Sequence, residues 1–279
     1  MYIRCWGSRG SIPVSGPEFN KYGGDTTCLE IRSSRGDIIV VDAGSGIRLL
    51  GYKLQKEKVK TIHQFFTHVH YDHTIGFPFF TPAYAHDTHL TIYGLPFMNS
   101  TFKETLHGVI QPPYFPVDLL NFPAQLTFKD IGKRSFSIGP IKISMIYLNH
   151  PNGGLGFRFE EKNSTFVFLT DNELADQRPG MLQFADFVDF CAGADLVIHD
   201  AEFDMQEYTL FKGYGHSTYP EVIDLGIAAG VKKMGLFHIH SHRTDKEMDA
   251  MAAKAKVLVK KRKASMQVFG VGNKFEINL

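Results

Sequence analysis

Short apolar runs alternate along the chain with longer stretches of helical periodicity, which predicts strands interleaved with helices. The strands are expected at 2–6, 28–32, 37–42, 62–66, 141–148, 157–159, 165–169, 195–198, 233–237 and 267–271. The helices are expected at 47–57, 180–191, 218–229 and 245–261. Both halves repeat this pattern, and no linker, repeat or low-complexity tract separates them. We therefore expect an α/β fold with one domain over residues 1–279.

The overall charge is close to neutral. Lys and Arg total 30 and Asp and Glu total 29, which leaves a formal net charge of +1. Such a chain has no global basic field, so a long nucleic acid is not an expected partner. The densest basic run, 254–263, has the spacing of an amphipathic helix, and we interpret it as a solvated helix face.

Cysteine usage and the lack of a long apolar segment bear on the compartment. The three cysteines are scattered and form no C-x-x-C pair, which argues against a disulfide framework and for a reducing environment. Residues 1–8 are typical of a strand leading into a Gly/Ser loop rather than of a signal peptide. No apolar run approaches the roughly 20 residues that cross a bilayer. We expect a cytoplasmic protein without a membrane partner.

The most informative polar motif is residues 67–73, T-H-V-H-Y-D-H, directly after a predicted strand. Side chains alternate along a strand, so His68 and His70 are expected to point the same way. Asp72 and His73 come one turn later, where the chain must bend. Imidazole binds zinc, iron and related ions, and a carboxylate beside it lets a second ion bind close to the first. The motif therefore predicts a metal site at the end of the strand.

The order H-x-H-x-D-H resembles the ligand motif of the metallo-β-lactamase superfamily. Members of that family share a four-layer αββα sandwich with a metal pair at one edge of the two sheets, and the resemblance implies this fold. The later ligands of the family match His150, Asp171 and His238, each at the end of an apolar run. If the alternation of residues 237–240 continues, His240 shares a face with His238 and is the alternative for the last ligand.

The resemblance implies two divalent ions, each held by three residues of its own and by Asp171, which is shared. The first ion would be held by His68, His70 and His150, and the second by Asp72, His73 and His238. Zinc is the first expectation, with manganese or iron as alternatives, because His/Asp sites accept several metals. Asp42 resembles an early aspartate of the family and is expected to support the histidines rather than to bind metal.

A second motif, G-H-S-T at 215–218, precedes a predicted helix. Capping preferences explain its Ser and Thr but leave His216 unexplained. Together with the acidic end of the apolar run 196–203, the motif resembles the His-Ser-Thr and His-Glu-Ala-Thr-Phe blocks of the RNase Z-like branch, which contains phosphodiesterases. The resemblance implies that His216 contacts the scissile phosphate and that Asp200 orients it. Asp200 stands where that branch more usually has glutamate.

These assignments predict a metal-dependent hydrolase that acts on ester bonds, namely a phosphodiesterase. Asp72 is expected to orient the attacking water or to accept its proton, in addition to binding metal. His216 is expected to stabilise the charged phosphoryl group or to protonate the leaving alkoxide. A redox protein of the flavodiiron type is disfavoured, because the ligand set looks complete and the chain has no spare length for a flavin domain.

The spacing between two of the expected metal ligands narrows the range of possible substrates. His150 and Asp171 are only 21 positions apart (171 − 150), which accommodates a hairpin but not the protruding arm of transfer-RNA-processing relatives. A small phosphodiester is therefore expected, with a cyclic nucleotide as the first candidate. RNA 3′-end processing of RNase Z type, or hydrolysis of a lactone or thioester, is the alternative.

Two further expectations concern substrate binding and assembly. Residues 109–123 carry four prolines and three aromatic residues, which could stiffen a loop and stack on a nucleobase. Simple packing over the sheet edge is the alternative for this segment. A homodimer that builds a two-sided cleft would suit the branch, although the residues themselves do not specify it.

Overall fold

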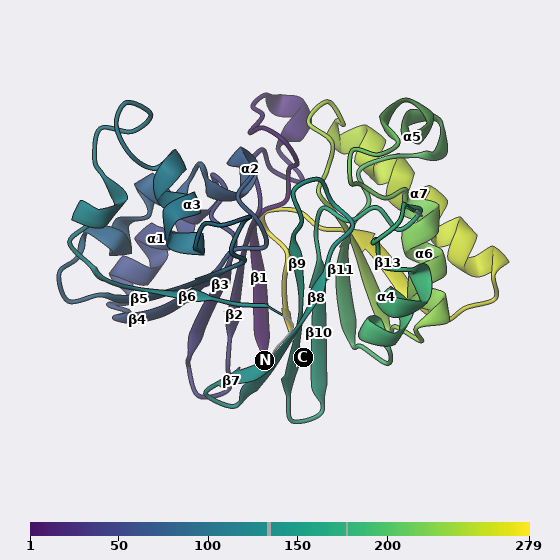
Figure 1. Cartoon of the computed structure of the whole chain (residues 1–279). Helices are drawn as coiled ribbons and strands as arrows, with labels where there is room; N and C mark the ends of the chain where they lie inside the picture. Colours follow the sequence, from purple (N-terminus) through teal and green to yellow (C-terminus); the bar gives the residue numbers. More distant parts are fainter. Residues whose placement is uncertain (133–134, 177) are drawn as a thin grey trace.

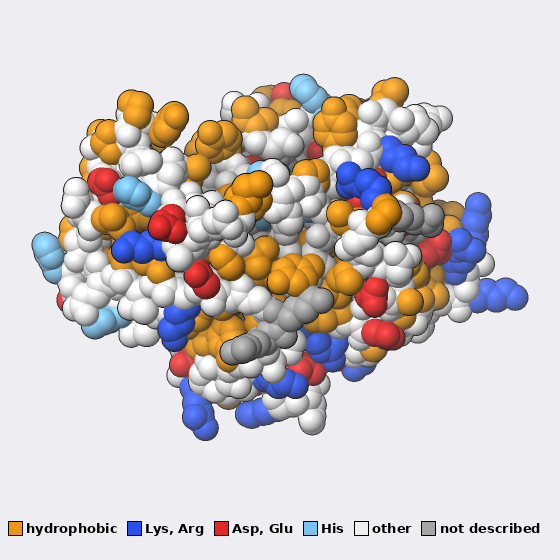
Figure 2. Space-filling model, in the orientation of Figure 1, with side chains coloured by type: hydrophobic (Ala, Val, Ile, Leu, Met, Phe, Trp, Pro, Cys, Tyr) orange, Lys and Arg blue, Asp and Glu red, His pale blue; other side chains and the backbone are white. Residues whose placement is uncertain are grey.

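The computed structural model arranges the strands in two seven-stranded sheets that face each other, with helices on both outer faces (Figure 1). It describes residues 1–132, 135–176 and 178–279. Within these residues, no helix is both long and apolar enough to span a membrane. The predicted four-layer sandwich is confirmed. On the face drawn in Figure 2, basic and acidic side chains lie interspersed.

The first sheet contains the N-terminal strands and the last strand of the chain. Its spatial order is β14 (Glu276–Asn278), β1 (Tyr2–Gly7), β2 (Cys28–Arg32), β3 (Ile38–Val41), β4 (Thr61–Phe65), β5 (His89–Gly94) and β6 (Gln125–Asp130). Neighbours are antiparallel from β14 to β3 and parallel from β3 to β6.

The second sheet follows the same plan. Its order is β13 (Gln267–Gly270), β12 (Lys233–Phe237), β11 (Leu196–Asp200), β10 (Ser164–Leu169), β9 (Leu155–Glu161), β8 (Ile141–Tyr147) and β7 (Phe136–Ile138). Strands β10 to β13 are parallel, and β8 runs in the same direction because β9 is antiparallel to both β8 and β10. The carboxyl ends of β8, β10, β11 and β12 therefore meet at one edge of the sheet.

The helices cover the outer faces. They are α1 (Ile47–Lys56), α2 (Tyr71–Thr74), α3 (Phe102–Val109), α4 (Phe184–Cys191), α5 (Met205–Phe211), α6 (Tyr219–Ala228) and α7 (Asp245–Lys261). Short 3₁₀ turns are η1 (Pro17–Phe19), η2 (Phe77–Phe79), η3 (Thr81–Tyr84) and η4 (Leu119–Asn121). The residues between the sheets form one apolar cluster, and each sheet forms another with its helices.

Aromatic side chains fasten the two sheets together. The rings of Phe65 from β4 and Phe157 from β9 lie 5.4 Å apart edge to face, and both side chains are fully buried. Within the second sheet, Phe168 and Phe237 make a similar edge contact at 5.3 Å. Large buried rings contribute much apolar area to a core, so these contacts hold the two ligand-bearing strand ends at a fixed separation.

The expected strands are present, with small shifts at their ends, but the sequence pattern missed others. Strands β5, β6, β7 and β14 were not predicted; β6 lies at the edge of its sheet, where most of its side chains are exposed and no buried alternation develops. The helix predicted at 180–191 begins only at Phe184. Gly180 has a φ of +90°, which the right-handed helix excludes.

Candidate metal centre

The heptapeptide forms a loop and a short helix at the carboxyl end of β4. His70 precedes the first residue of α2 with an extended backbone, and its carbonyl accepts the N–H of His73 at 3.0 Å. This turn sends Asp72 and His73 into the interior, where both are buried. The motif thus supplies two separate groups of side chains, one before the helix and one inside it.

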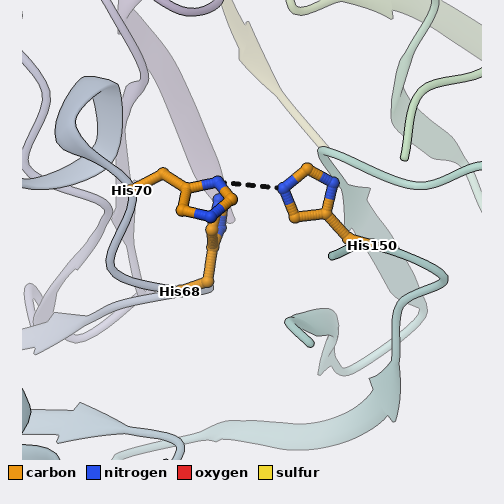
Figure 3. A group of neighbouring side chains, drawn as sticks. All are labelled: His68, His70 and His150. Carbon is orange, nitrogen blue, oxygen red and sulfur yellow. Dashed lines mark hydrogen bonds between the residues drawn. The ribbon is translucent and has the colours of Figure 1, made fainter. Parts of the chain in front are cut away.

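The first group consists of three imidazoles, here called the histidine cluster: His68, His70 and His150. Their ring nitrogens lie within 4.8 Å of one another. Nδ1 of His70 is 3.0 Å from Nε2 of His150, and the His68 and His150 ring centroids are 4.8 Å apart. Figure 3 shows the three rings converging, two from the loop after β4 and one from the loop after β8.

The second group, here called the carboxylate cluster, consists of Asp72, His73, Asp171 and His238, all of them buried. Nε2 of His73 lies 3.3 Å from Asp72 Oδ2 and 3.2 Å from Asp171 Oδ1. Nε2 of His238 lies 3.2 Å and 3.3 Å from the same two oxygens. Two imidazoles and two carboxylates therefore surround one small volume.

Asp171 lies between the two groups. Its Oδ1 faces His73 and His238, while its Oδ2 is 3.7 Å from Nε2 of His68 and 3.8 Å from Nε2 of His150. The residue follows β10 with a φ of +49°, an uncommon conformation for an aspartate, which is held by the surrounding structure. This position corresponds to the bridging role expected from the sequence.

Electrostatics differ sharply between the clusters. Burial lowers the pKa of His150 to about 4 and that of His68 well below the ordinary value, so these rings are neutral. Burial also opposes protonation of His73, but the carboxylates of Asp72 and Asp171 outweigh it and raise its pKa well above normal. A neutral imidazole is the form that binds metal, and a field that attracts protons attracts cations as well.

The residues present fit divalent metal ions. The Nε2 atoms of His68 and His73 are buried, and neither has a hydrogen-bond partner among the described residues. Buried polar atoms are normally paired, so two such nitrogens facing a shared carboxylate are suited to bind a cation. Three histidines with one aspartate form the first donor set, and two histidines with two aspartates form the second. Both sets are of the kind that zinc and similar ions use.

Asp42 orients His73 from behind, as the sequence predicted. Its Oδ2 lies 2.8 Å from Nδ1 of His73 and accepts the Thr67 hydroxyl, while its Oδ1 accepts the Thr67 backbone N–H. Asp42 is fully buried, so the contact is shielded from water. Holding Nδ1 in this way leaves Nε2 of His73 for the interior of the carboxylate cluster.

His216 lies against this centre and is paired with Asp200. Nδ1 of His216 is 2.8 Å from Asp200 Oδ2, and its ring stacks on that of His238 at 4.8 Å. A ring nitrogen of His216 also lies within 4.8 Å of ligand atoms of His150 and Asp171. Burial lowers the pKa of His216, but Asp200 and Glu202 outweigh it and raise the pKa to about 9.

Comparison with known proteins decides the family. The model of the beta-lactamase superfamily domain matches residues 38–239, a range that contains both clusters. The chain belongs to this superfamily. Its fold is therefore that of the superfamily.

Sequence relatives lie on the RNase Z side of the superfamily, as expected. Ribonuclease Z of Exiguobacterium sibiricum is 27% identical over 237 residues, covering 72% of this chain and 77% of that protein. Ribonuclease Z of Listeria monocytogenes is 24% identical over 287 residues, covering 88% of this chain and 92% of that protein.

Solved structures share the fold along the whole chain. Unliganded yeast PDE1 superposes with a TM-score of 0.73 at 14% identity, covering 100% of this chain and 99% of that chain. Human tRNase Z, short form, has a TM-score of 0.68 at 18% identity, with coverages of 100% and 99%. At these identities the likeness concerns the fold of the superfamily.

The structure brings His238, and not His240, into the carboxylate cluster. Strand β12 ends at Phe237, and His238 has a φ of +55°, so the alternation that would align the two histidines stops there. His240 instead stands beside Phe203 and Phe211, with Nε2 3.9 Å from Glu202 Oε1. The alternative for the last position is therefore not supported.

Sequence reasoning missed the part played by Glu202. This buried carboxylate places Oε2 3.2 Å from Nδ1 of His238 and 3.2 Å from Nδ1 of His216. Glu202 and Asp200 therefore both face His216, whereas only Glu202 of these two carboxylates contacts His238. The signal was present in the sequence, since Glu202 follows Asp200 by two positions at a strand end that was already singled out.

Two glycines allow the loops to approach the rings this closely. A Cβ on Gly215, which has a φ of +90°, would lie 2.1 Å from Nδ1 of His150, and that nitrogen contacts the Gly215 carbonyl at 3.1 Å. A Cβ on Gly10 would lie 2.4 Å from the ring of His238. The next residue, Ser11, donates its backbone N–H to Asp72 at 2.8 Å. The N-terminal loop is thus a wall of the centre that the sequence did not reveal.

Proposed function

We propose that this protein is a dinuclear metal-dependent phosphodiesterase of small substrates, with a 3′,5′-cyclic nucleotide as the first candidate. The observation that carries the proposal is the His216–Asp200 contact directly beside two ligand clusters that share Asp171. A phosphodiester carries a negative charge before and during the reaction, and a cationic histidine beside the two clusters would stabilise it.

The ligand roles follow from the two clusters. We assign one ion to the histidine cluster, a second to the carboxylate cluster, and Asp171 to both. Zinc is proposed first, and manganese and iron are alternatives, because this donor set accepts each of them. Two such ions supply an activated water near neutral pH and neutralise charge on the phosphoryl oxygens.

The remaining chemistry is assigned to side chains of the chain itself. Asp200 accepts two backbone N–H groups, from Asn172 and Glu202, so its carboxylate is fixed before it contacts His216. It holds Nδ1 of His216 and leaves Nε2 to donate a proton to the phosphoryl oxygen or the leaving alkoxide. Asp72, held by the Ser11 N–H, is placed to orient the attacking water or to accept its proton.

The size of the substrate is argued from what surrounds the centre. Between His150 and Asp171 the chain forms only the β9–β10 hairpin, so no arm extends from this part of the described structure. The net charge of +1 offers little attraction for a long polyanion. RNA 3′-end processing is the second candidate, and it is favoured by the relatives named Ribonuclease Z.

Assembly and compartment remain predictions within this proposal. The three cysteines are free and buried, which suits a reducing compartment such as the cytoplasm. A homodimer would be detected by light scattering coupled to size-exclusion chromatography.

The decisive experiment compares substrates on one metal-loaded preparation at neutral pH. The panel holds bis(p-nitrophenyl) phosphate, purine and pyrimidine 3′,5′-cyclic nucleotides, a transfer-RNA precursor and a lactone. We expect hydrolysis of the diester or a cyclic nucleotide, and its loss in both His216→Ala and Asp72→Ala. Preferred cleavage of the transfer-RNA precursor would select the second candidate.

The same panel can overturn the proposal. Lactone hydrolysis that survives His216→Ala, without diester hydrolysis, would make His216 a helix-capping neighbour rather than a catalytic residue. Metal content measured on each variant separates loss of catalysis from loss of metal, because His216→Ala is expected to keep both ions.

A further inference from the structure

An apolar groove borders α2, the helix that carries Asp72 and His73. Its walls come from α2 and the residues after it, from η2, and from the end of α3 with the loop that follows, and its volume is about 370 Å³. Tyr71, Ile75, Phe79, Tyr114 and Phe115 are among its lining residues. None of the described residues lining it carries a formal charge.

The aromatic side chains of this groove are unusually exposed. Tyr114 is 76% exposed, Tyr71 70% and Phe79 56%. Phe79 and Phe115 meet edge to face with ring centroids 5.7 Å apart, so one side of the groove is a built aromatic surface. Figure 2 shows hydrophobic side chains gathered along the upper left of its face, the region above α3 in Figure 1. Exposed aromatic side chains that line one groove together form a candidate binding surface.

The groove and the metal centre share α2 as a common wall. Asp72 and His73 point from this helix into the carboxylate cluster, while Tyr71 and Ile75 line the groove. Tyr71 and Ile75 are four positions apart and therefore adjacent on one helix face. Tyr71 stands between His70 and Asp72 in the chain, so the edge of the groove adjoins the segment that carries ligand-type side chains.

We infer that this groove binds the nucleobase of the substrate, on the ester group that keeps the phosphate when the bond at the metal centre is broken. The inference rests on the proposed phosphodiesterase function and adds its substrate class. An uncharged groove with exposed aromatic walls binds a ring by stacking and by burial of apolar area, and every base offers such a face. The chain therefore selects for the presence of a ring rather than for one base.

A kinetic test keeps the reacting bond constant and changes only the other ester group. Thymidine 5′-(p-nitrophenyl phosphate) and methyl p-nitrophenyl phosphate release the same p-nitrophenolate, but only the first carries a base. We expect wild type to prefer the thymidine ester in kcat/KM. Tyr114→Ala and Phe79→Ala should each reduce this preference by roughly tenfold, the usual worth of one stacked base, and mainly through KM. Hydrolysis of the methyl ester should be unchanged.

Tyr52→Ala is the matched control, because Tyr52 is a half-exposed tyrosine on α1 that does not line the groove. It should alter neither ester. An unchanged preference in Tyr114→Ala and Phe79→Ala, with both esters still hydrolysed, would overturn the inference and leave the proposed function standing. Failure of wild type to hydrolyse either ester would instead count against the proposed function.

A binding measurement tests the groove without catalysis. The fluorescence of 2-aminopurine riboside 5′-monophosphate is lowered when its base stacks on an aromatic side chain. We expect saturable quenching by the wild-type protein and its loss in the Tyr114→Ala, Phe79→Ala double variant. Absence of quenching by wild type would overturn the inference, whatever the activity. If quenching persists in the double variant and its oligomeric state changes, the groove is a contact surface for a second copy of the chain. That result would also overturn the inference.

Discussion

The histidine cluster and the carboxylate cluster come from the same heptapeptide, yet they are supported in different ways. In the carboxylate cluster all four side chains are buried, and Asp42 and Glu202 hold the outer nitrogens of its two rings. In the histidine cluster His70 is only partly buried, its outer nitrogen lies 3.4 Å from the exposed Asn152, and the outer nitrogen of His150 contacts the Gly215 carbonyl.

This difference teaches that similar ligands need not give similar sites. A buried carboxylate behind an imidazole fixes its orientation and increases its basicity, and both effects strengthen metal binding. The carboxylate cluster has two such partners and the histidine cluster has none among the described residues. We therefore expect the carboxylate cluster to bind its ion more tightly and the histidine cluster to exchange its ion more readily.

The largest effect is expected from Asp171→Asn, which removes the charge that the two clusters share. Both positions should lose affinity, and kcat/KM for a diester should fall on the order of a thousandfold, ~4 kcal/mol in the barrier. Elemental analysis and steady-state kinetics would measure this. Asp195→Asn, at the opposite end of the same sheet, is the control and should keep two ions. Retention of two ions by Asp171→Asn would remove the bridging role.

Asp42→Asn should change the metal affinity of one cluster and not that of the other. Loss of the carboxylate behind His73 is expected to weaken the carboxylate cluster about 10- to 100-fold, while the histidine cluster keeps its affinity. Competition with a chromophoric chelator resolves the two affinities. Equal weakening of both positions would mean that the clusters form one cooperative site and that our comparison is wrong.

Glu202→Gln should have a smaller effect, because the amide oxygen can still accept one hydrogen bond from His238 or His216. We expect about a tenfold loss of metal affinity at the carboxylate cluster together with a lower kcat. Asp200→Asn is the matched comparison, since Asp200 contacts the ring of His216 but not that of His238. It should lower kcat and leave metal affinity intact. If both variants changed metal affinity and kcat in the same way, the contact between Glu202 and His238 would have no separate role.

The smallest effect is expected at the support of the histidine cluster. Asn152→Ala removes an exposed contact at 3.4 Å, and such a contact contributes little against competing water. Metal affinity and kcat/KM should change by less than about threefold. A tenfold change in metal affinity would show that His70 depends on Asn152, and the two clusters would then be less different than proposed.

The resemblance of the heptapeptide to the superfamily motif predicted the fold and named most of the residues that the structure gathers in the two clusters, and the local pattern of apolar runs agreed with it. Apolar runs of strand length end at His150, Asp171 and His238, and the heptapeptide presents its four ligand-type residues within one strand end and one helical turn. Edge strands such as β6 were missed, since a strand with little buried surface has no clear apolar alternation. The helix predicted from residue 180 began late, because the conformation of Gly180 excludes it.

By itself the sequence determined which residue types reach the sheet edge and in what order, since these follow from local spacing along strands. Only the tertiary structure decided between His238 and His240, because a single left-handed residue after β12 ends the alternation. Packing alone brought Glu202 against two rings and the Ser11 N–H against Asp72, a contact across 61 positions. Such contacts depend on how distant loops meet at the edge of two sheets, which periodicity along the chain does not encode.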